Sequence, residues 1–210
     1  MANPAQPPCI KGSLVLGAVV TVRRMRDRGR IAPDQLAARL SAGALRLLDE
    51  KIDFGRWYPL DEFCEILDTD WEVGGKRDPD YMREEGARAA DRLFESGIYQ
   101  QLQFAERSGR ANATDNLIRR TKLITTITGS LFNFLTTEVR LNPEQRDSLE
   151  ILYNNASGYS EALRYTTEGF MNQINKRQGS SRRWSSSRVR PDLVLFTLRL
   201  PRRMTEGTNG

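Results

Sequence analysis

The hydrophobic pattern of this chain changes near residue 145, and that change restricts the fold more than any other feature. Before it, apolar residues recur at intervals of three and four, which is typical of helices that bury one face. After it, short apolar runs between turn residues predict strands at 149–153, 181–189 and 192–200, and a helix at 161–178. The pattern therefore predicts an α+β fold, in which an N-terminal helical layer packs on a small antiparallel sheet formed by a C-terminal strand–helix–strand–strand unit.

The helical part is divided by proline, glycine and acidic residues. Pro33-Asp34 and Asp78-Pro79 are typical helix starts, because proline suits the first turn and a carboxylate there interacts favourably with the helix dipole. Gly86 and its alanine neighbours leave room for a second helix at close range. The run after Ser13 is rich in valine, so a strand is an alternative there. We expect helices at 13–29, 33–48, 59–73, 79–97, 98–108 and 114–141.

The 210 residues are enough for one domain with its own hydrophobic core. We expect a mobile lead at 1–10, a single α+β domain at 11–203 and a disordered tail at 204–210. No apolar run approaches the roughly 18 residues of a transmembrane helix, and the first residues lack the pattern of a signal peptide. Only two cysteines are present, Cys9 and Cys64, so a reducing cytoplasm is the simplest location.

The chain contains no histidine. This absence removes Ser-His-Asp and Cys-His catalysis, and with them the usual histidine-ligated haem, zinc and iron sites. Neither a phosphate-binding glycine loop nor a nucleophile-elbow motif occurs. Asp61, Glu65, Asp68 and Glu72 share a helix face without a second ligand set, so they predict a solvated acidic face rather than a metal site. We therefore expect no enzymatic activity, no metal and no cofactor.

The net charge of +5 conceals an uneven distribution, with local nets of +5 over 1–60, −6 over 61–110, 0 over 111–150 and +6 over 151–210. Two basic clusters around an acidic middle favour charge complementarity within or between chains over nucleic-acid binding. Arginines flank Trp184, and we expect the indole to point inward and the arginines outward along an edge strand. The candidate basic surface consists of Arg23, Arg24, Arg26, Arg182, Arg183, Arg188 and Arg190.

Several short motifs resemble those of an uncharacterised protein family abundant in myxobacteria. The resemblance spans roughly residues 11–200, and its most specific parts are the W-Y-P-L and E-G-F sequences. In element order that family is similar to the haem-NO-binding and 4-vinyl-reductase ligand-binding domains, and to the Bet3-type subunits of vesicle-tethering complexes. The motifs are Gly55-Arg56-Trp57-Tyr58-Pro59-Leu60, Gly86, Leu93-Phe94-Glu95-Ser96-Gly97-Ile98-Tyr99, Leu131-Phe132-Asn133-Phe134 and Glu168-Gly169-Phe170-Met171.

The chain departs from the haem-NO-binding pattern at the residues that hold the cofactor. That family has a proximal histidine, which is absent here. Its Tyr-x-Ser-x-Arg clamp for the haem propionates is also missing, because the run from Tyr159 to Arg164 has a different spacing. The C-terminal cysteines of the 4-vinyl-reductase domains are absent too. The resemblance thus implies the fold without the haem.

The resemblance still implies an apolar pocket between the helical layer and the sheet, a space that holds haem, a small ligand or an acyl chain in related folds. The main hypothesis is therefore a non-catalytic sensory or regulatory domain that binds a small apolar molecule or lipid and acts through a protein partner. The alternative is a ligand-free adaptor that self-associates or joins a larger assembly. A cluster of aromatic residues is also typical of an ordinary core. The expected pocket lining is Trp57, Tyr58, Phe63, Phe132, Phe134, Tyr165 and Phe170.

Overall fold

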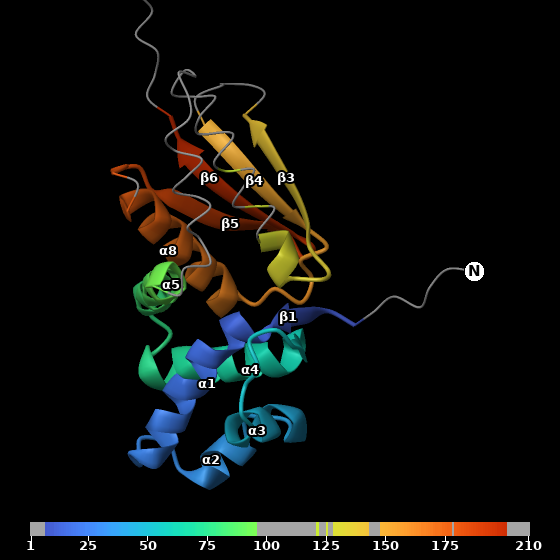
Figure 1. The fold of residues 1–210 in the computed structure, drawn as a ribbon, viewed down its shortest axis with the longest axis vertical. Helices are drawn as coiled ribbons and strands as arrows, with labels where there is room; N and C mark the ends of the chain where they lie inside the picture. The colour runs from blue at the N-terminus through green and yellow to red at the C-terminus, as the bar shows by residue number, and fades with distance from the viewer. Residues whose placement is uncertain are drawn as a thin grey trace, which may run out of the picture.

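The computed structural model describes residues 7–95, 121, 125, 128–142, 148–177 and 179–200. Within this part of the chain the predicted α+β class is confirmed. A four-stranded antiparallel sheet lies at one end of the molecule and the helices α1 to α4 at the other, with α5 and α8 beside the sheet (Figure 1). One hydrophobic core runs from Ile10 and Val15 at the N-terminal end to Phe196 and Leu198 in the sheet. The two predicted parts therefore fold against each other.

The helical end is closed by a two-stranded ribbon. Strand β1 (Cys9–Lys11) pairs antiparallel with β2 (Trp57–Pro59), which sets Ile10 opposite Tyr58. Helix α1 (Gly12–Asp27) follows β1, and α4 (Leu60–Thr69) follows β2 and continues into a π-helical turn, η1 (Asp70–Gly74). Cys9 and Ile10 thus belong to a strand, although the sequence pattern assigned them to a mobile lead.

The predicted helix at 33–48 is wrong as a single element. It consists of α2 (Pro33–Ala37) and α3 (Ala42–Asp49), with a break at 38–41. The Ser41 hydroxyl accepts a hydrogen bond from the Ala44 amide at 3.2 Å and so caps the new helix. Leucine periodicity continues through the break because Leu36, Leu40, Leu47 and Leu48 are all buried in the same core.

The sheet contains one strand more than the sequence pattern predicts. Strand β3 (Thr136–Leu141) lies in the stretch predicted as the end of a long helix, and that prediction is wrong there. Two threonines and a valine favour an extended chain, and pairing along the whole of β4 (Ser148–Asn154) satisfies its backbone. Strands β5 (Trp184–Arg190) and β6 (Leu193–Arg199) complete the order β3-β4-β6-β5. The C-terminal unit is therefore strand–strand–helix–strand–strand.

Helices α5 (Pro79–Glu95) and α8 (Glu161–Arg177) join the two ends of the molecule. They cross at two glycines: a Cβ atom on Gly86 would lie 1.9 Å from the Thr166 carbonyl oxygen, and one on Gly169 equally close to the Arg83 carbonyl oxygen. The close approach predicted for Gly86 is confirmed. Only residues without a Cβ allow the two backbones to approach so closely.

A buried carboxylate strengthens this crossing. Glu168 accepts hydrogen bonds from Arg83 Nε on α5 at 2.7 Å and from the Ser186 backbone amide on β5 at 2.9 Å. The E-G-F motif therefore joins α8 to both of its neighbours.

Some of the predicted elements fall outside the residues that the structure describes. The predicted helix at 98–108, the first turns of that at 114–141 and the tail at 204–210 lie there entirely. The division into lead, domain and tail stays a prediction. Of the helices in the described ranges, none has the length and apolar composition needed to cross a membrane.

Candidate ligand-binding groove

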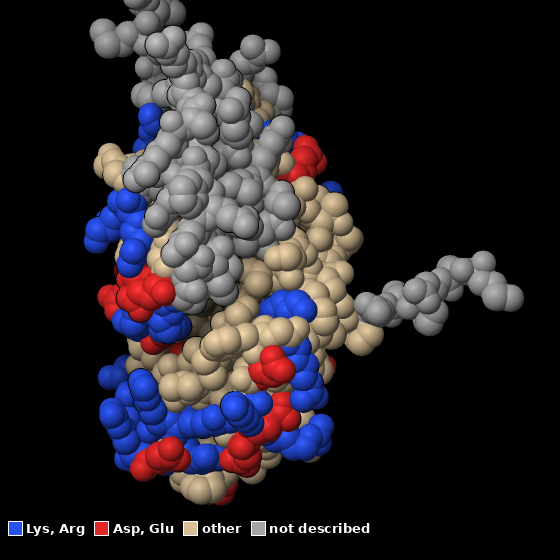
Figure 2. Space-filling model, viewed as in Figure 1, with Lys and Arg blue, Asp and Glu red and all other residues tan. Residues whose placement is uncertain are grey.

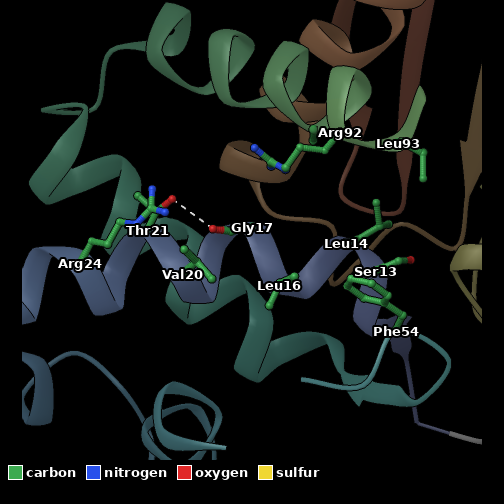
Figure 3. Close-up of a pocket in the computed structure, with 11 residues that line it drawn as sticks. Ser13, Leu14, Leu16, Gly17, Val20, Thr21, Arg24, Phe54, Arg92 and Leu93 are labelled. Carbon is green, nitrogen blue, oxygen red and sulfur yellow. Dashed lines mark hydrogen bonds between the residues drawn. The ribbon is translucent and has the colours of Figure 1, made fainter. Parts of the chain in front are cut away.

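An apolar groove of about 350 Å³ runs between α1 and α5. Leu14 on α1 points toward Leu93 on α5, Phe54 lies beside Ser13 at one end, and Arg24 stands at the other (Figure 3). This volume falls within the range of about 300–1,000 Å³ that is usual for small-molecule pockets. The described lining residues are Ser13, Leu14, Leu16, Gly17, Val20, Thr21, Arg24, Phe54, Ala89, Arg92 and Leu93.

The groove follows from the two-faced pattern of α1. Val15, Val19 and Val22 are completely buried and turn toward the core. Other apolar residues of α1, namely Leu14, Leu16 and Val20, are only partly buried and line the groove. A helix with apolar residues on both faces needs a second apolar partner. Here α5 approaches that second face without filling the space between the helices.

Small residues keep the groove open. Gly17 on α1 and Ala89 on α5 present almost no side chain to it. A Cβ atom on Gly17 would lie 2.7 Å from the nearer guanidinium nitrogen of Arg92, so the guanidinium group lies across the helix at this glycine. The neighbouring Thr21 hydroxyl already has an acceptor, because it donates to the Gly17 carbonyl oxygen at 3.0 Å. Most of this groove would therefore bind a ligand through shape and apolar contact rather than through directed hydrogen bonds.

A second cavity continues from the Arg24 end of the groove. It has a volume of about 220 Å³ and shares Thr21, Arg24 and Arg92 with the groove. We call it the arginine cleft. Its described lining residues are Thr21, Arg24, Met25, Arg28, Arg30, Tyr81, Glu85, Arg88 and Arg92. The cleft carries five arginines against one glutamate, so it provides a strongly positive end to an otherwise apolar site.

A buried carboxylate lies against the wall of this cleft. Asp70, at the start of the π-helical turn, is 1% exposed and accepts a hydrogen bond from the Tyr81 hydroxyl at 2.8 Å. Burial raises the pKa of Asp70 to about 6, although the hydrogen bond from Tyr81 opposes that shift. Burial and the neighbouring Asp70 in turn raise the pKa of Tyr81 well above its usual value. Asp70 therefore changes charge close to neutral pH.

The seven aromatic residues expected to line a pocket pack in different parts of the fold. None of the seven lines the groove, the arginine cleft or the third cavity considered below. Phe63 is buried in the core, and the rings of Phe132 and Phe134 contact each other edge to face, 5.9 Å apart. The ring of Tyr165 contacts that of Trp71 edge to face, whereas Phe170 packs in a separate small cluster with Ala90 and Ile174.

The W-Y-P-L residues have structural contacts. Trp57 is 39% exposed with the Lys11 ammonium 4.0 Å from its ring centre, and the buried Tyr58 hydroxyl accepts from the Asp53 amide at 2.9 Å. These contacts explain the motif without a ligand.

Several arginines of the expected basic surface serve structural contacts. Arg23 donates to the carbonyl oxygens of Leu47 and Leu48 and so caps the C-terminal end of α3. Arg188 pairs with Glu161 at 2.8 Å and also donates to the Tyr159 carbonyl oxygen. Surface pairs join Arg26 to Asp49 at 2.8 Å and Arg190 to Asp192 at 3.2 Å. The predicted inward position of Trp184 is confirmed, since it is 3% exposed.

The other arginines of that set line cavities in two different places. Arg24 lines the groove and the cleft, whereas Arg182 and Arg183 line a third cavity of about 780 Å³ between α5, α8 and residues 180–183. On the face shown in Figure 2, lysines and arginines mixed with acidic residues cover the end formed by α1 to α4. The structure thus divides the predicted basic surface and adds Arg88 and Arg92, which the sequence pattern did not single out.

Neither thiol lines any of the three cavities. Cys64 is buried, with its Sγ atom 3.6 Å from the Gly158 carbonyl oxygen, and burial raises its pKa to about 11. Burial also raises the pKa of the Cys9 thiol. Across the described ranges, no three acidic, cysteine or histidine side chains come together as metal ligands.

Comparison with known proteins supports the fold alone. No family model and no curated protein matches the sequence. Among solved structures, the chain is similar to an unliganded Fe(II) H-NOX protein mutant from K. algicida, with a TM-score of 0.60, 14% identity, and coverage of 93% of this chain and 98% of that one. A mutant H-NOX protein from T. Tengcongensis gives a TM-score of 0.52 and 13% identity over 91% of this chain and 98% of that one.

A further similar structure comes from work on haem distortion in the H-NOX family, with a TM-score of 0.54 and 12% identity over 91% of this chain and 95% of that one. The expected haem-NO-binding-like fold is thereby confirmed.

The residues present do not fit a haem group held in the manner that the resemblance implies. The chain has no histidine to serve as a proximal ligand. The described lining of the α1–α5 groove contains no cysteine, tyrosine or methionine, which are the other common axial ligands. The fold is therefore present without the ligand set for haem iron among the residues that line this groove.

Proposed function

We propose that this chain is a non-catalytic sensory domain that binds a small apolar ligand, other than haem, in the groove between α1 and α5. The observation that supports this most directly is the groove itself, which has the volume of a small-molecule site and a predominantly aliphatic lining. The H-NOX-like fold also supports a ligand-binding role, because one of the similar structures comes from a study of haem distortion in H-NOX proteins. The missing histidine separates this chain from them.

The absence of catalysis is part of the proposal. The described groove lining includes two hydroxyls, those of Ser13 and Thr21, and two arginines, but no carboxylate or thiol that could act as a general base or nucleophile. The ligand would instead act by joining α1 to α5. Since α5 crosses α8 at Gly86, a ligand that changes the position of α5 would also act on α8 and the sheet. We expect the signal to pass to a protein partner or a second copy of the chain in the cytoplasm.

Native mass spectrometry of the purified protein tests this function. We expect a mass excess in the native spectrum that disappears on denaturation. The variant Ala89→Trp, which fills part of the groove, should lose that excess. The matched variant Ala87→Trp, two residues along α5 and lining the third cavity, should retain it.

A native spectrum without any mass excess, for a sample that also fails to take up an added apolar probe, would contradict the proposal. If that ligand-free protein had twice the chain mass, the ligand-free adaptor would be favoured instead. Phe54, which is 61% exposed at the end of the groove, would then be a natural contact for the second copy. The narrower resemblance to an uncharacterised myxobacterial family stays a prediction.

A further inference from the structure

We propose that the ligand of the groove is an amphipathic anion, whose apolar body lies between α1 and α5 and whose phosphate, sulfonate or carboxylate group lies in the arginine cleft. This inference rests on the proposed function and specifies the chemical class of its ligand. The groove and the cleft share Thr21, Arg24 and Arg92, so one molecule can occupy both.

The charges of the cleft are largely uncompensated. Among the described residues, Arg88 is the one arginine of the cleft with acidic partners, Glu85 at 2.6 Å and Glu84 at 3.6 Å. Within the described part of the chain, no carboxylate forms an ion pair with the side chains of Arg24, Arg28, Arg30 or Arg92. Elsewhere in the structure arginines such as Arg83 and Arg188 have acidic partners. A group of like charges around one cavity is relieved by a bound anion.

The helix dipole does not by itself account for the cluster. Arg24 and Arg28 stand at the C-terminal end of α1, where positive charge is favourable. Arg88 and Arg92, however, come from the middle and last turns of α5 and reach the same cavity. Arg92 does so by lying across Gly17, where any side chain on α1 would displace its guanidinium group. Two helices thus bring guanidinium groups to the place where the apolar groove ends.

Guanidinium groups suit the oxygen atoms of such an anion. Their planar N–H donors match carboxylate and phosphate oxygens in pairs. The cleft, at about 220 Å³, has room for one such group but is small for a nucleotide chain. The adjoining space of about 350 Å³ then holds the apolar remainder of the molecule. A small amphiphile is favoured over nucleic acid because the groove beyond the arginines is aliphatic.

Two fluorescent probes that differ in one charged group test the inference. They are 8-anilinonaphthalene-1-sulfonate and its neutral analogue N-phenyl-1-naphthylamine. We expect the full-length protein to bind the sulfonate at least tenfold more tightly than the neutral analogue. The double variant Arg24→Gln/Arg92→Gln should weaken sulfonate binding about tenfold, and neutral-probe binding less than about twofold. The control Arg183→Gln, at the third cavity, should change neither.

The outcomes separate this inference from the proposed function. Equal affinity for the two probes, or equal weakening by the double variant and by Arg183→Gln, overturns the anionic ligand and leaves the apolar groove intact. Binding of neither probe overturns the proposed function and this inference together. Displacement of the sulfonate by a short single-stranded oligonucleotide at lower concentration than by sodium dodecyl sulfate also overturns it, because the cleft would then serve a polymer. Circular dichroism confirms that each variant is folded.

Discussion

The crossing of α5 and α8 provides a sharp test of the packing described here. Replacing Gly86 by alanine adds one methyl group, which in the present arrangement would lie 1.9 Å from the Thr166 carbonyl oxygen and 2.8 Å from the Phe170 amide nitrogen. Both neighbours are backbone atoms of α8, so they cannot rotate away as a side chain could. The helices would have to separate by more than an ångström to accept the methyl group.

The magnitude follows from two opposing effects. Alanine in the middle of a helix is favoured over glycine by about 1 kcal/mol. Overpacking of a close contact costs roughly 1–3 kcal/mol, and more where backbone must move. Separation of the helices also lengthens the hydrogen bonds from Arg83 to Glu168 and from Gln173 to Asp91, each worth about 1–3 kcal/mol when charged. We expect Gly86→Ala to lower the free energy of unfolding by about 2–4 kcal/mol.

Equilibrium unfolding in urea, followed by far-ultraviolet circular dichroism, measures this change. The control is Gly129→Ala, at a helical residue where an added Cβ meets no atom within 4 Å. It should leave stability unchanged or raise it by up to about 1 kcal/mol. Equal stability changes in the two variants would refute the close crossing. A gain in stability for Gly86→Ala would refute it as well.

Three further predictions concern buried polar groups. Because the pKa of Asp70 is raised to about 6, its ionisation opposes folding as pH rises from about 4 to 6; two pKa units correspond to about 3 kcal/mol. Asp70→Asn keeps an oxygen that can accept from the Tyr81 hydroxyl but has no charge to titrate. Between pH 4 and pH 7, its free energy of unfolding in urea titrations should therefore rise by about 3 kcal/mol relative to that of the unchanged protein. A difference between the two proteins that stays constant over this pH range would contradict the prediction. Glu168→Gln should cost about 2–4 kcal/mol in the same assay at pH 7, because Arg83 loses its buried partner; a cost below about 0.5 kcal/mol would show that the contact is dispensable. Arg23→Gln should lower the midpoint of thermal unfolding, because it removes the donors that cap α3, whereas an unchanged midpoint would argue against this role.

The local sequence predicts those elements whose stability depends on one buried face. Helices α1, α4, α5 and α8 and strands β4, β5 and β6 are confirmed, since each has a clear period of apolar residues. The ribbon of β1 and β2 could not be predicted in this way, because Cys9–Lys11 and Trp57–Pro59 have three residues each and depend on a partner far along the chain. Strand β3 follows directly after Leu131 and Phe134, whose spacing continues the helical pattern.

The candidate site was harder to predict than the fold. Aromatic residues were expected to line a pocket, but the groove is lined mainly by aliphatic residues, together with glycine and alanine. The signal in the sequence was the second apolar face of α1, at Leu14 and Val20, which is only partly buried. The basic run near Arg24 was recognised, but Arg88 and Arg92 join it only through the packing of α5 against α1.

The central claim is that the space between α1 and α5 binds a small apolar molecule. An equilibrium fluorescence titration with N-phenyl-1-naphthylamine tests it most directly when the unchanged protein is compared with Ala89→Trp and Ala87→Trp, both on α5. We predict one saturable site in the unchanged protein and in Ala87→Trp, and at least tenfold weaker binding in Ala89→Trp. Equal binding by the two variants, or no saturable binding to the unchanged protein, would contradict the claim.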